Sequence, residues 1–196
     1  ELVDYHRAMF LEDAKLDSFV HECDVIVHLA AQNRSNDNDS LYQNNVGLIE
    51  KLISSCERMN TKPKIIYASS TQESKDNAYG LSKLHGRDLF QSWVSKFNSQ
   101  VISLVIPNVF GPFGKPGYNS FISTFSHSLI IGETPKIIDD NDIELIYVND
   151  LVKKIYLEIE RKNQKGLFIR IIEPTVNIKV SAVLDILVKF KNTYLK

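Results

Sequence analysis

The sequence predicts an α/β protein in which helices cover both faces of a doubly wound parallel sheet. Two observations support this fold class. Short apolar runs rich in β-branched residues recur along the chain, and longer runs with apolar residues at helical spacing separate them. Strands that alternate with helices are joined by right-handed crossovers, and such connections make neighbouring strands parallel.

The first half of the chain shows this alternation most clearly. A buried strand is predicted within 23–31, "CDVIVHLAA", and a polar loop, "QNRSNDND", follows it. A helix is predicted next, up to about Asn60, and a second buried strand at 62–70, "KPKIIYASS". A long helix is then expected from Tyr79, followed by a third strand at 100–110, "QVISLVIPNVF". The apolar positions at helical spacing are Leu41, Val46, Ile49, Leu52, Ile53 and Cys56 in the first helix, and Leu84, Leu89, Phe90, Trp93, Val94 and Phe97 in the second.

The second half is less regular. Residues 118–132, "YNSFISTFSHSLIIG", favour a helix, and residues 143–162 favour a short strand that runs into a helix. Residues 179–194 favour a closing helix with Ser181 near its start. No internal repeat or linker interrupts the chain, so one domain spanning residues 1–196 is the simplest interpretation.

Composition and charge exclude several classes of function. The formal net charge of -1 gives no electrostatic basis for binding nucleic acid or an anionic membrane surface. No apolar run approaches the roughly 20 residues that span a bilayer. Cys23 and Cys56 have no metal-ligand spacing, so we expect reduced core thiols and no metal, as in a cytoplasmic protein.

A candidate proton-transfer site lies in residues 69–83, "SSTQESKDNAYGLSK". Ser69 and Ser70 end a predicted strand, and ligands of parallel sheets bind at the carboxyl ends of strands. Tyr79 and Lys83 are four residues apart at the start of a helix, so they share one face. A nearby ammonium is expected to lower the pKa of a tyrosine, and the pair could then exchange a proton with a substrate alcohol or carbonyl. The Y-x-x-x-K spacing alone also occurs by chance in many helices.

Five short motifs resemble a known family in their order. They are "HLAA" (28–31), "NNVG" (44–47), "YASS" (67–70), "YGLSK" (79–83) and "PNVFGP" (107–112). They resemble the extended short-chain dehydrogenases/reductases of the NAD-dependent epimerase/dehydratase family, which have a Rossmann-like fold and act on nucleotide sugars. "HLAAQNR" and "FGPFGKPGYNS" are most similar to capsule-synthesis reductases that reduce a UDP-linked 4-keto-6-deoxy-N-acetylhexosamine with NADPH.

The resemblance implies a role for each matching residue. Tyr79 would be the acid-base residue, Lys83 would hold the nicotinamide ribose, and Ser70 would hydrogen-bond the C4 oxygen of the sugar, with Ser69 as the alternative. The remaining cofactor-binding residues would be Arg7, Leu29, Ala30, Ala31, Asn45, Pro107 and Val109, and Asn108 and Asn119 would face the substrate. Arg7 either meets the 2'-phosphate of NADPH, with NADH as the other candidate, or is a surface arginine. The family also implies a homodimer through the helices near 40–58 and 79–97. Their apolar positions are broad enough to supply a second face, notably Leu89, Phe90, Trp93, Val94 and Phe97.

The phosphate-binding turn is the part of the pattern that does not match. Gly111, Gly114 and Gly117 have the G-x-x-G-x-x-G spacing, but Pro112 and Pro116 lack the N–H groups that bind phosphate. The resemblance therefore implies a domain that lacks its first strand and glycine-rich turn, with a small substrate-binding C-terminal part. Two alternatives to the reductase stay open: a C4 epimerase or dehydratase, and an inactive fragment that cannot hold a dinucleotide. Thr71 and Gln72, in place of the Asp-Glu pair usual in dehydratases, disfavour the dehydratase.

Overall fold

The chain folds into two compact units that alternate along the sequence. The computed structural model describes residues 2–3, 6–162 and 165–195. The first unit comprises Glu1–Ile106 and Ile155–Ile171, and the second comprises Pro107–Lys154 and Ile172–Lys196.

The first unit is built on a four-stranded parallel sheet with the order β1-β2-β3-β6. The strands are β1 (Val25–His28), β2 (Lys64–Ser70), β3 (Gln100–Ile106) and β6 (Gly166–Ile171). Every neighbouring pair is parallel. This confirms the predicted α/β fold and the positions of the three predicted strands. β2 and β3 are buried almost throughout, whereas Val25 and Val27 of β1 are only half-buried. β6 was not predicted, because it is short and has only partly buried and exposed residues.

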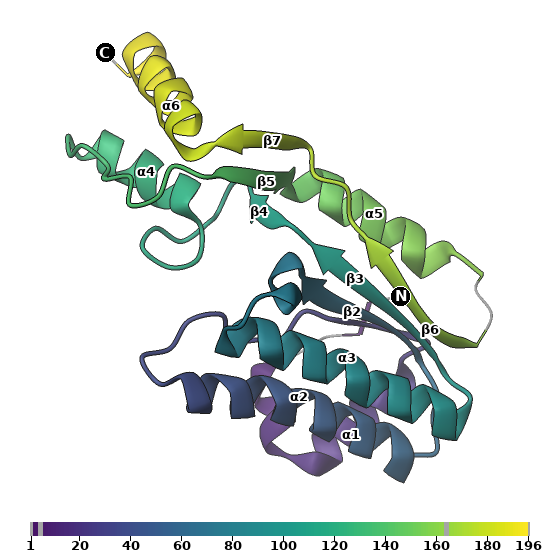
Figure 1. The fold of residues 1–196 in the computed structure, drawn as a ribbon. Helices are drawn as coiled ribbons and strands as arrows, with labels where there is room; N and C mark the ends of the chain where they lie inside the picture. Colours follow the sequence, from purple (N-terminus) through teal and green to yellow (C-terminus); the bar gives the residue numbers. More distant parts are fainter. Residues whose placement is uncertain (1, 4–5, 163–164, 196) are drawn as a thin grey trace. The chain divides into compact units, whose positions relative to one another are not determined.

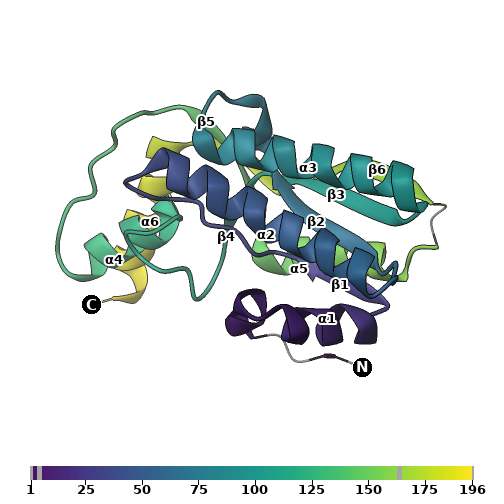
Figure 2. The same ribbon diagram turned by 90° about the horizontal axis from the view of Figure 1, so that it is seen from below.

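Helices cover both faces of this sheet, as a doubly wound fold requires. One face carries α1 (Asp13–Glu22), α2 (Asn38–Arg58) and α3 (Ala78–Phe97) side by side, after the 3-10 helix η1 (Arg7–Leu11) (Figures 1 and 2). The C-terminal turns of α5 (Val148–Glu160) lie on the other face. Lys64 fixes them there: its buried ammonium donates to the carbonyls of Glu158, Ile159 and Arg161 at the end of the helix. Cations at a helix C-terminus are stabilising because they satisfy carbonyls that have no partner within the helix.

The core of this unit lies between α1–α3 and the sheet. Its centre contains Leu16, Ile49, Ile65, Phe90 and Val101. α3 approaches closely because Gly86 has no side chain: a Cβ there would lie 2.3 Å from Ile49 Cδ1 and 2.7 Å from the Tyr67 hydroxyl.

One argument for the homodimer is corrected by this core. The breadth of the apolar stripe of α3 predicts a second surface that faces a partner subunit. Phe90, Trp93 and Val94 are instead buried inside the unit, and Leu89 and Phe97 pack against the same cluster. The stripe is broad because α3 contacts the sheet and α2 together, so its width indicates no second face.

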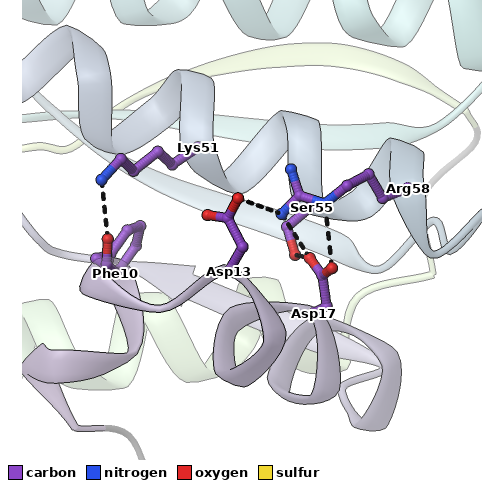
Figure 3. Close-up of polar contacts among 6 residues, drawn as sticks. All are labelled: Phe10, Asp13, Asp17, Lys51, Ser55 and Arg58. Carbon is purple, nitrogen blue, oxygen red and sulfur yellow. Dashed lines mark hydrogen bonds and ion pairs between the residues drawn. The ribbon is translucent and has the colours of Figure 1, made fainter.

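A polar network attaches η1 and α1 to α2 (Figure 3). The Asp17 carboxylate accepts hydrogen bonds from Ser55 Oγ at 2.6 Å and from Arg58 Nη2 at 2.7 Å. The hydrogen bond from Arg58 lowers the pKa of Asp17 below its ordinary value. Lys51 Nζ also donates to the Phe10 carbonyl at 3.0 Å. These contacts orient α1 on α2, while the apolar contacts below them supply most of the stability.

The second unit contains a small mixed sheet and two helices. Its strands β4 (Asn108–Phe110), β5 (Asp142–Tyr147) and β7 (Val176–Lys179) have the order β4-β5-β7; β4 and β5 are parallel, and β5 and β7 are antiparallel. The helices α4 (Phe121–Ile130) and α6 (Val180–Tyr194) confirm two predictions. The predicted third strand is divided at Pro107, so that 108–110 joins this sheet instead of continuing β3.

No helix in 6–162 or 165–195 combines the length and hydropathy needed to cross a membrane. No group of His, Cys, Asp and Glu side chains in that part of the chain is arranged to hold a metal. Cys23 and Cys56 are free thiols, and Cys56 is buried, as predicted for core cysteines. Burial raises the pKa of Cys56 to about 12, so this thiol is not reactive at neutral pH.

Candidate active site

The structure brings the predicted serines, tyrosine and lysine together at the carboxyl end of β2. Ser69 and Ser70 are the last residues of β2, and the 3-10 helix η2 (Thr71–Ser74) connects them to α3. Tyr79 lies in the first turn of α3 and Lys83 in the next turn. Lys83 Nζ is 5.6 Å from the centroid of the Tyr79 ring. Asn77 fixes the start of this helix, because its side chain accepts a hydrogen bond from Gly80 N at 2.8 Å.

Lys83 is a buried cation that uses one of its N–H donors within the described part of the protein. Its side chain extends beneath the end of β2, where Nζ donates to the Ala68 carbonyl at 2.8 Å. Burial lowers its pKa to about 8, so the ammonium form still predominates at neutral pH. An ammonium group carries three N–H donors, and one is used here. Two donors therefore remain for a ligand such as a ribose.

The pKa of Tyr79 corrects one expectation. The sequence analysis expected Lys83 to lower it, but burial of the phenol raises it above the ordinary value. The attraction of the ammonium does not outweigh the cost of placing a phenolate in a poorly solvated position. Tyr79 is therefore a protonated phenol at neutral pH. A protonated phenol can donate to a substrate carbonyl, which is the role that a reduction requires.

The two serines differ in how their hydroxyl protons are used. Ser69 Oγ donates to Glu73 Oε2 at 2.6 Å. Ser70 Oγ instead accepts a hydrogen bond from Gln72 N at 3.2 Å, as the N-cap of η2. The Ser70 hydroxyl thus keeps its own proton available for a ligand, whereas the Ser69 proton is directed at Glu73. This geometry favours Ser70 over Ser69 as the donor to a substrate oxygen.

Asn45 lies in α2 and fastens the segment after β1. Its Oδ1 accepts from Gln32 N at 2.7 Å, and its Nδ2 donates to Gln32 O at 2.8 Å and to Ser82 Oγ at 3.0 Å. Ser82 in turn donates to the Tyr79 carbonyl at 2.7 Å. These contacts connect the loop, α2 and the first turn of α3. Every hydrogen bond of the Asn45 side chain goes to protein, so its predicted contact with a cofactor stays a prediction.

The carboxyl end of β1 presents apolar surface of the kind that a nicotinamide ring would contact. Leu29 is 61% exposed although it is apolar, and Ala30 and Ala31 are small and half-buried. His28, one residue earlier, belongs instead to the core. It packs against Phe10, Tyr67 and Phe90, and burial lowers its pKa to about 3, so it is neutral.

A cavity of about 560 Å³ adjoins Tyr79. One wall is the loop between β1 and α2 together with the start of α2, and the other is η2 with the start of α3. Its lining is mainly amide and hydroxyl side chains without a carboxylate: Asn33, Arg34, Ser35, Asn36, Asn38, Leu41, Gln72, Asn77, Ala78 and Tyr79. The sequence analysis treated this loop only as a connection. Its density of amide side chains after a strand was the signal that could have identified it.

The remaining predicted site residues belong to the second unit or have side chains outside the described residues. Pro107, Asn108, Val109 and Asn119 belong to the second unit, and their predicted contacts with cofactor and substrate stay predictions. Asn108 Nδ2 donates to the Glu144 carbonyl at 3.3 Å within that unit. Arg7 begins η1, but its side chain is outside the described part of the structure, as is Tyr5.

The glycine-rich segment 111–117 does not form a phosphate cradle within the second unit. A Cβ at Gly111 would lie 2.4 Å from Val148 Cγ1, and one at Gly114 would lie 2.2 Å from Ser123 Oγ. The N–H of Gly117 donates to Thr124 Oγ1 at 2.9 Å, so it is already satisfied. Close packing and turn formation explain these glycines. This supports the interpretation that they have the spacing of a phosphate-binding motif without its function.

Comparisons with known proteins agree with the fold. The sequence profile of the NAD dependent epimerase/dehydratase family matches residues 2–171. A UDP-2-acetamido-2,6-beta-L-arabino-hexul-4-ose reductase of Pseudomonas aeruginosa is 30% identical over 183 residues, which are 91% of this chain and 48% of that protein. The chain thus spans about half the length of this curated relative.

Solved structures show the same similarity. The capsular polysaccharide assembling protein CapF of Staphylococcus aureus has a TM-score of 0.73 at 29% identity, covering 94% of this chain and 49% of CapF. The UDP-glucose 4-epimerase of Thermotoga maritima has a TM-score of 0.83 at 16% identity, with 95% and 68% covered. The UDP-glucuronic acid 4-epimerase of Bacillus cereus, solved with UDP-glucuronic acid and NAD, has a TM-score of 0.81 at 19% identity, with 93% and 64% covered. The predicted resemblance is confirmed, and the chain belongs to the NAD-dependent epimerase/dehydratase family.

Proposed function

We propose that the native protein reduces a UDP-linked 4-keto-6-deoxy-N-acetylhexosamine with NADPH, as a step in the synthesis of a capsular or other surface polysaccharide. The observation that carries this proposal is a protonated Tyr79 beside the Lys83 ammonium, at the edge of a polar cavity. Ser70 begins the short helix η2 that forms part of the wall of this cavity. A 4-keto reductase needs a proton donor for the carbonyl oxygen, and this arrangement supplies one. The similarity to a reductase of a related sugar supports the same conclusion.

Each of the three residues has a distinct task in this reaction. Tyr79 gives its phenolic proton to the C4 oxygen as negative charge develops there. Ser70 donates a second hydrogen bond to the same oxygen, because its proton is not used within the protein. Lys83 stabilises the phenolate left by proton transfer, since an adjacent ammonium favours the charged form once the phenol has ionised.

The residues at the end of β1 fit the nicotinamide end of a dinucleotide. A bound NADPH would supply the hydride. Leu29, Ala30 and Ala31 offer an apolar surface without bulk, and the two free N–H donors of Lys83 suit the ribose hydroxyls. We propose NADPH over NADH because the resemblance implies that Arg7 meets the 2'-phosphate of the cofactor.

The cavity suits an uncharged, polar substrate part such as a sugar ring. Amide side chains both donate and accept, so Asn33, Asn36, Asn38 and Gln72 can pair with hydroxyl and acetamido groups. A volume of about 560 Å³ lies in the range of small-molecule sites. The resemblance implies that Asn108 and Asn119 also face the substrate.

A C4 epimerase is the second candidate. Several solved structures similar to this chain are 4-epimerases, and their identities of 16–21% show the shared fold alone. A dehydratase is disfavoured because Thr71 and Gln72 occupy the usual Asp-Glu positions. Incubation with a UDP-4-keto sugar and NADPH separates the two activities: a reductase consumes NADPH in proportion to product, and an epimerase leaves the cofactor unchanged.

Tyr79→Phe in the native protein tests the assignment of the proton donor. Turnover should fall at least about a hundredfold, because general acid catalysis contributes 10²–10⁴. NADPH affinity should be retained, because the ring stays in place. Tyr156→Phe is the matched control, since Tyr156 is 59% exposed and lies in α5. Normal turnover in Tyr79→Phe would show that the alkoxide takes its proton from another group.

A further inference from the structure

Glu73 connects three elements around the candidate active site. Its carboxylate accepts from Ser69 Oγ at the end of β2, and its other oxygen pairs with Arg87 Nη1 on α3. Glu73 itself lies in η2, the 3-10 helix that follows Ser70 and carries Gln72 into the cavity wall. The side chains of Glu73 and Arg87 are only 12% and 20% exposed.

The packing of η2 on α3 shows that this short helix needs a close fit. A Cβ at Gly80 would lie 2.0 Å from the Gln72 carbonyl oxygen and 2.9 Å from that of Lys75. The backbone of η2 therefore lies directly against the first turn of α3, one residue from Tyr79. Any other residue at position 80 would push η2 away from the helix. Lys75 N closes the end of η2 by donating to Gln72 O at 2.9 Å.

From these contacts we propose that Glu73 and Arg87 are positioning residues, which act through η2 on Ser70 and Gln72. This inference rests on the proposed reduction at Tyr79. The pair clamps η2 between the end of β2 and α3. The clamp fixes the Gln72 amide that donates to Ser70 Oγ, and thereby directs the Ser70 proton to the substrate oxygen. It also engages the Ser69 hydroxyl, which keeps that hydroxyl from competing for the same oxygen.

The physical reason lies in the nature of a half-buried ion pair. Removing two charges from water costs about as much free energy as their attraction returns, so such pairs contribute little net stability. Their hydrogen bonds are strongly directional, however, and a carboxylate that holds two donors has one well-defined orientation. The pair therefore defines where η2 lies, and misplacing a reacting group by about 1 Å can cost about a hundredfold in rate.

A matched control exists in the same unit. Asp17 also accepts from one serine, Ser55, and one arginine, Arg58, and it also joins two elements. That network ties α1 to α2 (Figure 3) and includes no residue of η2 or α3. Asp17→Asn and Arg58→Met thus remove the same chemical groups as Glu73→Gln and Arg87→Met. Arg87→Lys keeps the charge and tests for partial rescue.

The first measurement is kinetic and uses the native protein. Glu73→Gln and Arg87→Met should each lower kcat by about tenfold or more and raise KM for the UDP-4-keto sugar, since both Ser70 and Gln72 lose their position. Arg87→Lys should recover part of kcat. Asp17→Asn and Arg58→Met should leave both constants within about twofold. Equal losses in the Glu73 and Asp17 variants would overturn the proposal, because the pair would then only stabilise the fold.

The second measurement does not require turnover. Amide hydrogen exchange of the segment 70–77 should accelerate in Glu73→Gln and stay unchanged in Asp17→Asn, because the amides of Gln72 and Lys75 bond within this segment. Unchanged exchange in Glu73→Gln would refute the clamp. If the native protein reduces no UDP-4-keto sugar, the proposed function fails, whereas the exchange result still decides whether Glu73 and Arg87 hold η2.

Discussion

Replacing Lys83 with Met should stabilise the native protein at neutral pH while removing its activity. Lys83 is 3% exposed, and burial lowers its pKa from 10.5 to about 8. The difference of about 2.5 units, at 1.36 kcal/mol each, means that the buried ammonium costs about 3 kcal/mol at pH 7. Met has a similar length, fills the same space and carries no charge.

One contact reduces this gain. The hydrogen bond from Lys83 Nζ to the Ala68 carbonyl is lost, and leaving that buried acceptor without a partner costs about 1 kcal/mol. The free energy of unfolding of Lys83→Met should therefore exceed that of the parent by about 2 kcal/mol at pH 7. Removing a buried charged group from an active site is expected to stabilise a protein, because such a group is kept for catalysis at a cost in folding free energy.

The pH dependence gives the sharper test. Between pH 8 and 10.5 the unfolded chain binds more protons at Lys83 than the folded chain, so the stability of the parent rises through this range relative to the variant. Urea unfolding of both proteins at pH 7, 8, 9 and 10 measures the difference. The advantage of the variant should shrink steadily above pH 8. A variant that is less stable than the parent at pH 7, or an advantage that does not change up to pH 10, would refute this account of Lys83.

Two further predictions concern binding and assembly. The isolated 196-residue chain should bind NADPH hardly at all. The connection after β1, residues 29–37, contains no glycine, and the N–H of Gly117 already bonds to Thr124, so neither segment offers a phosphate-binding turn. Saturable micromolar binding in calorimetry would contradict this prediction, and residues 111–117 would be the first segment to test. The native protein should be a homodimer in which α2 and α3 pack against their copies in the partner subunit. Leu81→Glu should weaken this dimer, because Leu81 lies on the exposed face of α3. Sedimentation that shows only monomer at micromolar concentration would exclude the dimer.

The sequence alone determined the framework of the first unit and the central residues of the site. β2 and β3 are buried almost throughout and β1 is buried at alternate residues, so each is visible in the sequence as a short apolar run. The helices α2 and α3 carry their apolar residues at helical spacing. The spacing of Tyr79 and Lys83 is local, since four residues on a helix fix a shared face without any tertiary contact. Their placement after Ser70 also follows from chain order, because strand ends of a parallel sheet meet at one edge.

Only the tertiary structure decided the properties that depend on neighbours distant in sequence. The direction of the Tyr79 pKa shift comes from how far the phenol is buried, and no local pattern encodes that balance. The difference between Ser69 and Ser70 depends on Glu73, whose orientation in turn depends on Arg87 fourteen residues later. The broad stripe of apolar residues on α3 predicts a dimer interface from the sequence, but α2 and the sheet cover this stripe within the unit. The whole fold sets how deeply a side chain is buried and which groups it bonds to. For this reason the sequence identifies Tyr79, Ser69 and Ser70 as candidate site residues but does not assign their pKa shifts or hydrogen-bond partners.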